Sequence, residues 1–139
     1  GAGLVFPFDG PPFWPFQQWA MRSRTLSQSP LGMLAHQDYG LWFAFRGAFL
    51  LSEAVEPAEA ASGGPCEACA EKPCLDACPA SALTRVHGYE PGTCRTHVAG
   101  AGRESCGALG CLVRHACPFG RDHAYSPEQA GFHMRAFIA

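Results

Sequence analysis

The sequence has no cysteine before residue 66, whereas all eight of its cysteines lie between Cys66 and Cys117. Small secreted domains that depend on disulfides usually contain roughly 8–10% cysteine, and such a framework would leave the first half of this chain without a bridge. Because eight is an even number, a disulfide-linked secreted protein stays open as an alternative. The confinement of the cysteines to one region favours metal binding by free thiolates.

Lysine, long apolar runs and targeting signals are also scarce, although the chain has nine arginines. Lys72 is the only lysine and the formal net charge is −2, so charge gives no support for a nucleic-acid partner. The longest apolar stretch, Leu41–Leu51, is interrupted by Arg46 and is too short to cross a bilayer. Gly1 is followed by neither a charged region nor an apolar signal segment. We therefore expect no signal peptide, no membrane association and a reducing, cytoplasmic setting.

The composition of the chain changes near residue 62. Residues 53–65 are acidic, small and rich in glycine and proline, as linkers often are. All three tryptophans and seven of the ten phenylalanines lie before this stretch, and every cysteine lies after it. We predict an α+β protein in two parts. Residues 1–62 are expected to form an aromatic-rich segment with a strand pair and a helix, which is the remnant of a larger domain or a platform for one. Residues 63–139 are expected to form a cysteine-rich module that ends in a helix.

Apolar patterning and helix-breaking residues predict the main elements. Leu4–Phe8 is expected to be a strand, and Pro15 to stand at the first turn of a short helix. Met33–His36 and Leu41–Leu51 are expected to form a hairpin across the polar connection between them. The second of these strands is apolar on both faces, so we expect it inside a sheet. A final helix is expected over residues 127–137, because a serine that can cap it precedes its first proline.

The cysteines form two groups, and each group ends in a Cys-Pro pair. The first group is Cys66-x2-Cys69-x4-Cys74-x3-Cys78-Pro79, and the second is Cys94, then Cys106-x4-Cys111-x5-Cys117-Pro118. Bacterial ferredoxins use the run C-x2-C-x2-C-x3-C-P, in which the cysteine before proline binds the other cluster. The first group follows this run with two residues inserted before its third cysteine. Eight thiolates are what two 4Fe-4S clusters require, so two such clusters are the predicted cofactors.

The ferredoxin pattern divides the eight ligands between the two clusters. The first cysteine set, predicted to bind cluster 1, is Cys66, Cys69, Cys74 and Cys117. The second cysteine set, predicted to bind cluster 2, is Cys78, Cys94, Cys106 and Cys111. Each set takes one ligand from the other group, because proline fixes the backbone after the cysteine and turns the chain away. No catalytic residue is predicted.

Zinc is the main competing metal, since structural sites of four cysteines are common. Zinc ribbons usually present paired C-x2-C knuckles, and this chain has one such pair, Cys66 with Cys69. Histidine replaces cysteine in some clusters, and His97, His115 and His123 lie near the cysteines in the sequence. Because eight thiolates already complete both sites, we expect these histidines not to be ligands.

The sequence HQDYGLWF at residues 36–43, together with the cysteine order, resembles the C-terminal half of the epoxyqueuosine reductase family. These enzymes depend on cobalamin and are related to reductive dehalogenases. The likeness extends from about Pro30 to Asp122 and includes the isolated Cys94 and the ending Cys117-Pro118-Phe119. It implies a strand pair that leads into a ferredoxin module. In that family the two 4Fe-4S clusters of the module pass electrons to cobalamin, which the preceding half of the protein mostly holds.

The chain departs from this family in two respects. Ser29–Gly32 stands where the family has a Gly-Lys-Asn stretch, and the half that carries most of the cobalamin site and the catalytic acid is absent. Both departures argue against cobalamin binding and against reductase activity by this polypeptide alone. We therefore expect a ferredoxin-like electron-transfer protein that is a shorter or truncated relative of the family.

Partners and alternatives follow from the same observations. The first part carries more aromatic surface than one helix and two strands can bury, so we expect an exposed apolar patch. The expected partner is a redox protein or the missing N-terminal half, and a homodimer is a further possibility. Two other functions stay open: the electron-delivery half of a cobalamin-dependent, epoxyqueuosine-reductase-like enzyme, and a zinc-stabilised interaction module.

Overall fold

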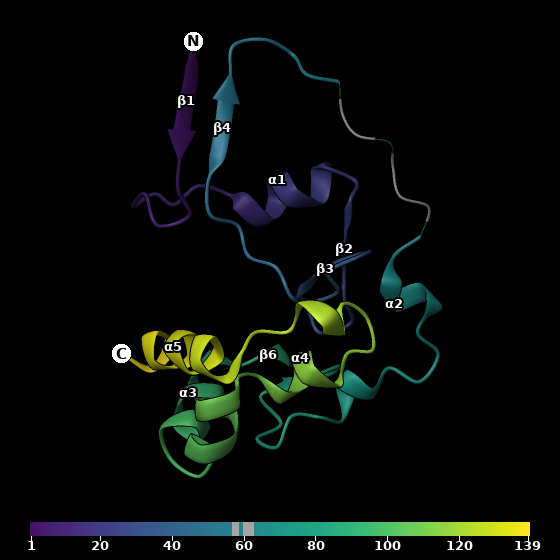
Figure 1. Cartoon of the computed structure of the whole chain (residues 1–139), viewed down its shortest axis with the longest axis vertical. Coiled ribbons are helices and arrows are strands. Elements are labelled where there is room, and N and C mark those ends of the chain that lie inside the picture. Colours follow the sequence, from purple (N-terminus) through teal and green to yellow (C-terminus); the bar gives the residue numbers. More distant parts are fainter. Residues whose placement is uncertain (57–58, 60–62) are drawn as a thin grey trace.

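The computed structural model describes residues 1–56, 59 and 63–139, and within them the strands form three separate antiparallel pairs (Figure 1). The strands are β1 (Ala2–Val5), β2 (Leu26–Gln28), β3 (Leu34–His36), β4 (Ala48–Leu51), β5 (Leu83–Thr84) and β6 (Gly88–Tyr89). The α-helices are α1 (Phe16–Arg22), α2 (Pro65–Ala68), α3 (Pro91–Ala99), α4 (Leu112–Ala116) and α5 (Pro127–Ile138). Shorter helical turns are the 3-10 turns η1 (Pro73–Leu75) and η3 (Arg121–His123) and the π-helical turn η2 (Arg103–Gly107). The protein is thus a small α+β fold, and the predicted boundary at residue 62 lies outside the described residues.

The pairing of the strands differs from the predicted hairpin. β3 pairs with β2, with Leu26 opposite His36, and β4 pairs with β1, with Leu4 opposite Phe49. The expected hairpin between Met33–His36 and Leu41–Leu51 is therefore wrong, and residues 42–47 have no regular structure. The expectation that the second strand lies inside a sheet is also wrong, because β4 has one partner and its Phe49 is 73% exposed.

The chain does turn tightly after β3, with an antiparallel bridge between His36 and Gly40, but the strand pairing ends there, and two glycines lie at this point. Gly40 (φ 53°) and Gly120 (φ 70°) both have left-handed backbone conformations, which residues with a side chain rarely adopt. A Cβ atom on Gly40 would overlap the Phe119 carbonyl, and one on Gly120 would overlap the Tyr39 carbonyl. The turn after β3 therefore contacts the turn before η3 backbone to backbone, and the next residues pack against the C-terminal half.

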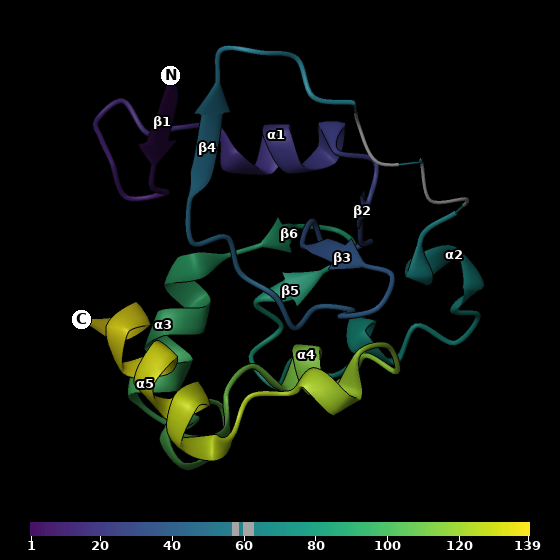
Figure 2. The same ribbon diagram turned by 45° about the horizontal axis from the view of Figure 1, so that its top comes forward.

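Proline and serine signals located two helices correctly. α1 begins directly after Pro15 and buries Phe16 and Ala20, which confirms the short N-terminal helix. α5 begins at Pro127, and the Ser126 hydroxyl accepts a hydrogen bond from the Gln129 amide at 3.3 Å. This is the cap that the sequence indicates. The helix lies beside α3 in Figures 1 and 2.

The buried core is built around cysteines. One apolar cluster joins Leu31, Cys74, Leu83 and Val113, and a second joins Ala35, Leu41 and Cys117. In both clusters the loop and strand of residues 31–41 pack on segments more than 30 residues away. The β2–β3 region is therefore the apolar cover of the cysteine loops, although it belongs to the aromatic-rich part of the sequence.

Leu31→Ala should lower the free energy of unfolding by about 2–5 kcal/mol, because it leaves a cavity against Cys74 and Val113. Leu31 is 1% exposed and is among the largest fully buried side chains. Leu109→Ala removes the same atoms from a side chain that is 45% exposed and should change stability by no more than about 0.5 kcal/mol. Denaturant unfolding of both variants measures the difference, and equal losses would contradict this view of the core.

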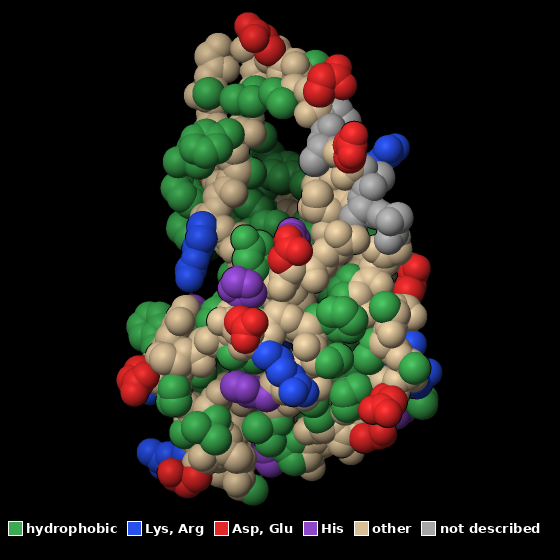
Figure 3. Space-filling view, turned by 45° about the vertical axis from the view of Figure 1, so that its right-hand side comes forward, with side chains coloured by type: hydrophobic (Ala, Val, Ile, Leu, Met, Phe, Trp, Pro, Cys, Tyr) green, Lys and Arg blue, Asp and Glu red, His purple; other side chains and the backbone are tan. Residues whose placement is uncertain are grey.

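The N-terminal elements leave many large apolar side chains at the surface, as expected. Figure 3 shows hydrophobic side chains gathered over the part of the molecule that β1, α1 and β4 form. The exposed members are Leu4, Phe8, Phe13, Trp14, Met21, Phe45, Phe49, Leu50 and Leu51. In the described part of the chain, no helix has the length and apolar character needed to cross a membrane.

Candidate metal centre

Short helical turns position the first cysteine set. Cys66 lies in the single turn of α2, Cys69 follows that turn, Cys74 lies in η1, and Cys117 follows α4. Lys72 reverses the chain between α2 and η1 with a left-handed backbone (φ 46°), and its ammonium group donates to the Cys69 carbonyl at 3.1 Å. Both turns begin with a proline, which is favoured at the first position of a helix.

The electrostatics of the first cysteine set indicate which thiols are neighbours. Burial raises the pKa of the Cys66 thiol, and the thiols of Cys117, Cys74 and Cys69 raise it further. Burial likewise raises the pKa of Cys74, followed by the effects of Cys117 and Cys69. The positive charge of Lys72 lowers both pKa values. The structure therefore brings Cys117 beside cysteines that lie more than 40 residues earlier in the chain.

The second cysteine set comes from four separate places in the fold, two of them inside helical elements. Cys78 follows η1, Cys94 lies in α3, Cys106 is buried in the π-helical turn η2, and Cys111 is the residue before α4. The Ala82 amide donates to the Cys78 sulfur at 3.3 Å. Amide hydrogen bonds of this kind stabilise a thiolate.

Tyr89 acts directly on this second set. Burial raises the pKa of Cys94, a hydrogen bond from the Tyr89 hydroxyl lowers it, and the thiols of Cys78 and Cys106 raise it. Burial and then Cys94 raise the pKa of Tyr89 to about 12, with smaller effects that include Cys111. The tyrosine is thus a neutral donor that favours the thiolate form of Cys94.

The start of α4 acts on Cys111 in a similar way. Burial raises the pKa of Cys111, and the backbone amides of Arg114 and Val113 lower it. These amides belong to the first turn of α4, and the Arg114 amide also donates to the Cys111 carbonyl at 3.0 Å. The thiols of Cys94 and Cys106 raise the same pKa. Cys94 and Cys106, the two thiols that raise the pKa of Cys111, both belong to the second cysteine set.

All eight cysteines are free thiols, so the described structure contains no disulfide framework. Among residues 1–56, 59 and 63–139, no three cysteine, histidine or acidic side chains approach closely enough to hold a single ion. The donor set nevertheless fits iron–sulfur ligation, because two groups of thiols, supported by N–H and O–H donors, are what such clusters bind. The division of the eight ligands between clusters stays a prediction.

The three histidines considered as alternative ligands have other surroundings. The His115 ring hydrogen-bonds the Leu109 carbonyl at 2.8 Å, and the His123 ring packs edge-on against Tyr39 at 4.7 Å. The Nε2 atom of His97 is buried and has no hydrogen-bond partner among the described residues. None of the three acts on the thiols whose pKa values shift.

Arg114 joins the aromatic segment to the cysteine module. Its guanidinium group donates through Nε and Nη2 to the Leu41 carbonyl. It also lies over the rings of Trp42 and Tyr125, at 4.6 and 5.0 Å from their centroids. Its backbone amide meanwhile acts on Cys111. One residue therefore fixes both the position of Trp42 and the start of α4.

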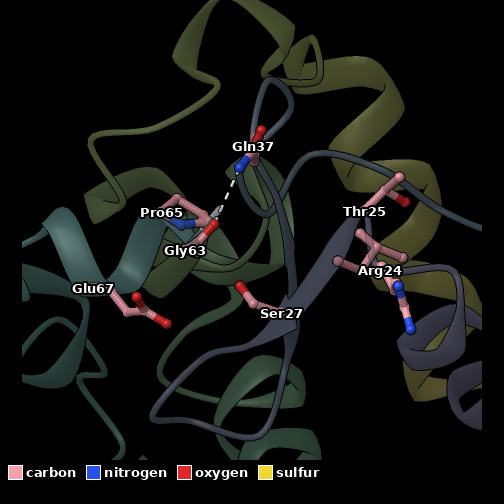
Figure 4. Close-up of a pocket in the computed structure, with 9 residues that line it drawn as sticks. Arg24, Thr25, Ser27, Gln37, Gly63, Pro65 and Glu67 are labelled. Atoms are coloured by element: carbon pink, nitrogen blue, oxygen red, sulfur yellow. Dashed lines mark hydrogen bonds between the residues drawn. The ribbon is translucent and has the colours of Figure 1, made fainter. Parts of the chain in front are cut away.

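A small polar cavity lies between the β2–β3 pair and the start of α2. It has a volume of about 190 Å³ and is lined by residues that include Arg24, Ser27, Gln37 and Glu67 (Figure 4). The Gln37 amide crosses its rim to donate to the Gly63 carbonyl at 3.1 Å. The cavity adjoins the helix that carries Cys66, and it is too small to hold a large cofactor.

The spacing of the cysteines located the candidate ligands, but sequence reasoning missed the groups around them. Tyr89 lies five positions before Cys94, and no motif marks it. The link from Arg114 to Leu41 spans 73 residues and depends on the tertiary fold. No protein-family model, curated protein or solved structure matches this chain.

Proposed function

We propose that the protein is a ferredoxin-like electron-transfer protein that carries two 4Fe-4S clusters. The observation that supports this function best is the grouping of the eight free thiols. Cys117 acts on Cys66 and Cys74, and Cys78 acts on Cys94. In each case a cysteine that precedes proline affects the pKa of thiols in the other group, which supports the crossed arrangement of ferredoxins.

The residues around the thiols supply what such a protein needs. The first cysteine set would hold one cluster and the second cysteine set the other, and each cluster when bound would accept or donate one electron at a time. Leu31, Leu41 and Val113 exclude water from the cysteine loops. The Ala82 amide and the Tyr89 hydroxyl stabilise negative charge on sulfur. Apolar cover and N–H or O–H donors are the means by which proteins tune cluster potentials.

The proposal includes a cytoplasmic location, where thiolates persist, and a protein partner in electron transfer. The exposed apolar side chains of β1, α1 and β4 support a larger assembly, because patches of this kind mark interaction sites. They also favour the second candidate function, in which this chain delivers electrons to a cobalamin-dependent reductase whose other half covers that patch. A homodimer would cover the same surface.

Protein purified without oxygen should contain about eight iron atoms and eight acid-labile sulfides per chain and absorb broadly in the visible range. Both follow from two four-iron clusters with eight thiolate ligands. Metal analysis and sulfide assay of the anaerobic protein test this directly. Stoichiometric zinc without sulfide would contradict the proposed function and favour a zinc-stabilised interaction module.

A further inference from the structure

We infer that a second copy of this chain covers the apolar surface exposed around β1 and β4, so that the protein is a dimer with two-fold symmetry. The inference goes beyond the proposed function and depends on neither cluster. In Figures 1 and 2, β1 and β4 lie at the opposite end of the molecule from α3 and α4. The N-terminal apolar surface is defined by the exposed side chains of Leu4, Phe8, Phe13, Trp14, Phe49 and Leu51.

One face of the β1–β4 sheet is apolar and uncovered. Leu4 pairs with Phe49, and Ala2 pairs with Leu51, so these four residues share one face. Leu4, Phe49 and Leu51 are 51%, 73% and 54% exposed. β1 and β4 pair only with each other in the described part of the chain, and an isolated two-stranded sheet is marginally stable. A partner packed over this face would therefore stabilise the sheet.

The N-terminal apolar surface has both protruding rings and a hollow. Phe8 and Phe13, in the connection between β1 and α1, are 73% and 65% exposed. Trp14 and Phe45 border a pocket of about 510 Å³ that is also lined by Phe16. A two-fold dimer places the same patch of each copy against the other, so a ring of one copy can fill the hollow of its partner. Rings buried in pockets are typical anchors of protein interfaces, and this self-complementarity favours a second copy as the occupant.

The charges around β4 are also self-complementary. β1, β4 and residues 6–14 contain one charged side chain, Asp9, whose carboxylate accepts a hydrogen bond from the Phe6 amide at 2.7 Å. Arg46 precedes β4, and Glu53 follows it. When the two-fold axis is perpendicular to β4, Arg46 of one copy lies at the same end of the interface as Glu53 of the other. Opposite charges at each end favour this pairing of identical surfaces.

The exposed area is sufficient for a stable dimer. The side chains that define the N-terminal apolar surface expose between 42% and 73% of their area. Because a large aromatic side chain offers about 150–250 Å², they present roughly 700 Å² together. A standard interface takes about 800 Å² from each partner. The N-terminal apolar surface and its polar rim together reach this size.

The test is sedimentation equilibrium of the anaerobically purified protein, for the wild type and two variants. At about 100 µM, far above the micromolar dissociation constants of the weakest interfaces of this size, the wild type should have twice the chain mass of 14.8 kDa. Phe49→Asp places a carboxylate from each copy in the apolar interface and should raise the dissociation constant by about 100-fold. Phe132→Asp is the matched control, because Phe132 is 62% exposed on α5, and it should remain dimeric.

Three results would each overturn the inference: a monomeric wild type, a Phe49→Asp variant that dimerises as tightly as the wild type, or a Phe132→Asp variant that dissociates. A monomeric wild type that sediments with phosphatidylcholine vesicles would assign the surface to a membrane instead. Iron and sulfide analysis tests the proposed function separately, so either can fail alone.

If Phe49→Asp does not fold, dilution of the wild type provides a second test. Trp14 is 42% exposed in a single copy, and the dimer would cover it. Tryptophan emission should therefore shift to the red as the mass falls from that of a dimer to that of a monomer. Emission that stays constant across this range would place the interface elsewhere and overturn the inference.

Discussion

Removal of iron by a chelator under anaerobic conditions is expected to unfold the region from Leu31 to Cys117 and to leave α1 largely intact. The helical turns that carry the cysteines span three to nine residues and are too short to be stable alone. Structural zinc in zinc-finger peptides contributes about 10–16 kcal/mol to folding, a magnitude similar to the total stability of a typical domain, about 5–15 kcal/mol. Leu31, Ala35 and Leu41 would lose the cysteine loops that bury them.

Tryptophan fluorescence distinguishes the two regions. Trp42 is 5% exposed and lies under Arg114, so its emission should shift to the red when iron is removed. Trp14 is already 42% exposed and packs against Trp19, so the emission maximum of a Trp42→Phe variant should change little. A Trp14→Phe/Trp19→Phe variant reports Trp42 alone. Emission from Trp42 that stays blue after complete loss of iron would show that the fold does not depend on the metal.

Cys117→Ser should perturb the same cluster as Cys74→Ser and leave the other cluster intact. The reason is that Cys117 acts on Cys66 and Cys74, although it follows Cys111 by six residues in the sequence. We expect each variant to lose or convert one cluster, with iron falling from about eight to about four atoms per chain. Electron paramagnetic resonance of the reduced protein identifies which signal remains.

Cys94→Ser is the matched variant for the second cysteine set. It should remove the signal that survives in Cys117→Ser, because the thiols of Cys78 and Cys106 raise the pKa of Cys94. If Cys117→Ser and Cys94→Ser instead removed the same signal, the two clusters would each be built from one sequence group. The ferredoxin arrangement would then be wrong for this protein, although the presence of clusters would stand.

Local signals explain which parts of the fold the sequence predicted. α1 begins directly after Pro15, and α5 begins at Pro127 behind the Ser126 cap; both signals act within a few residues of the helix start. The pairing of the strands could not be predicted from such local signals. β4 pairs with β1, more than 40 residues earlier, and strands of three or four residues carry too little pattern to specify a partner.

The candidate site shows the same division between local and distant effects. The cysteine spacing names all eight cysteines as candidate ligands, and their role as ligands stays a prediction. Tyr89, which acts on Cys94, and Arg114, which binds the Leu41 carbonyl, have no such signature. Their roles depend on where β6 and α4 lie in the folded protein, and this is fixed by the packing of Leu83 and Val113.

The backbone contact between the turns at Gly40 and Gly120 joins the β2–β3 region to the C-terminal cysteine loops. A side chain at either position meets the backbone of the other turn, so neither substitution is relieved by a change at a single neighbouring side chain. Recombination within the linker would join a β2–β3 region from one ancestor to cysteine loops from another and would have to preserve both glycines. The two regions would therefore have to be exchanged together to keep this contact, although residues 53–65 separate them in the sequence.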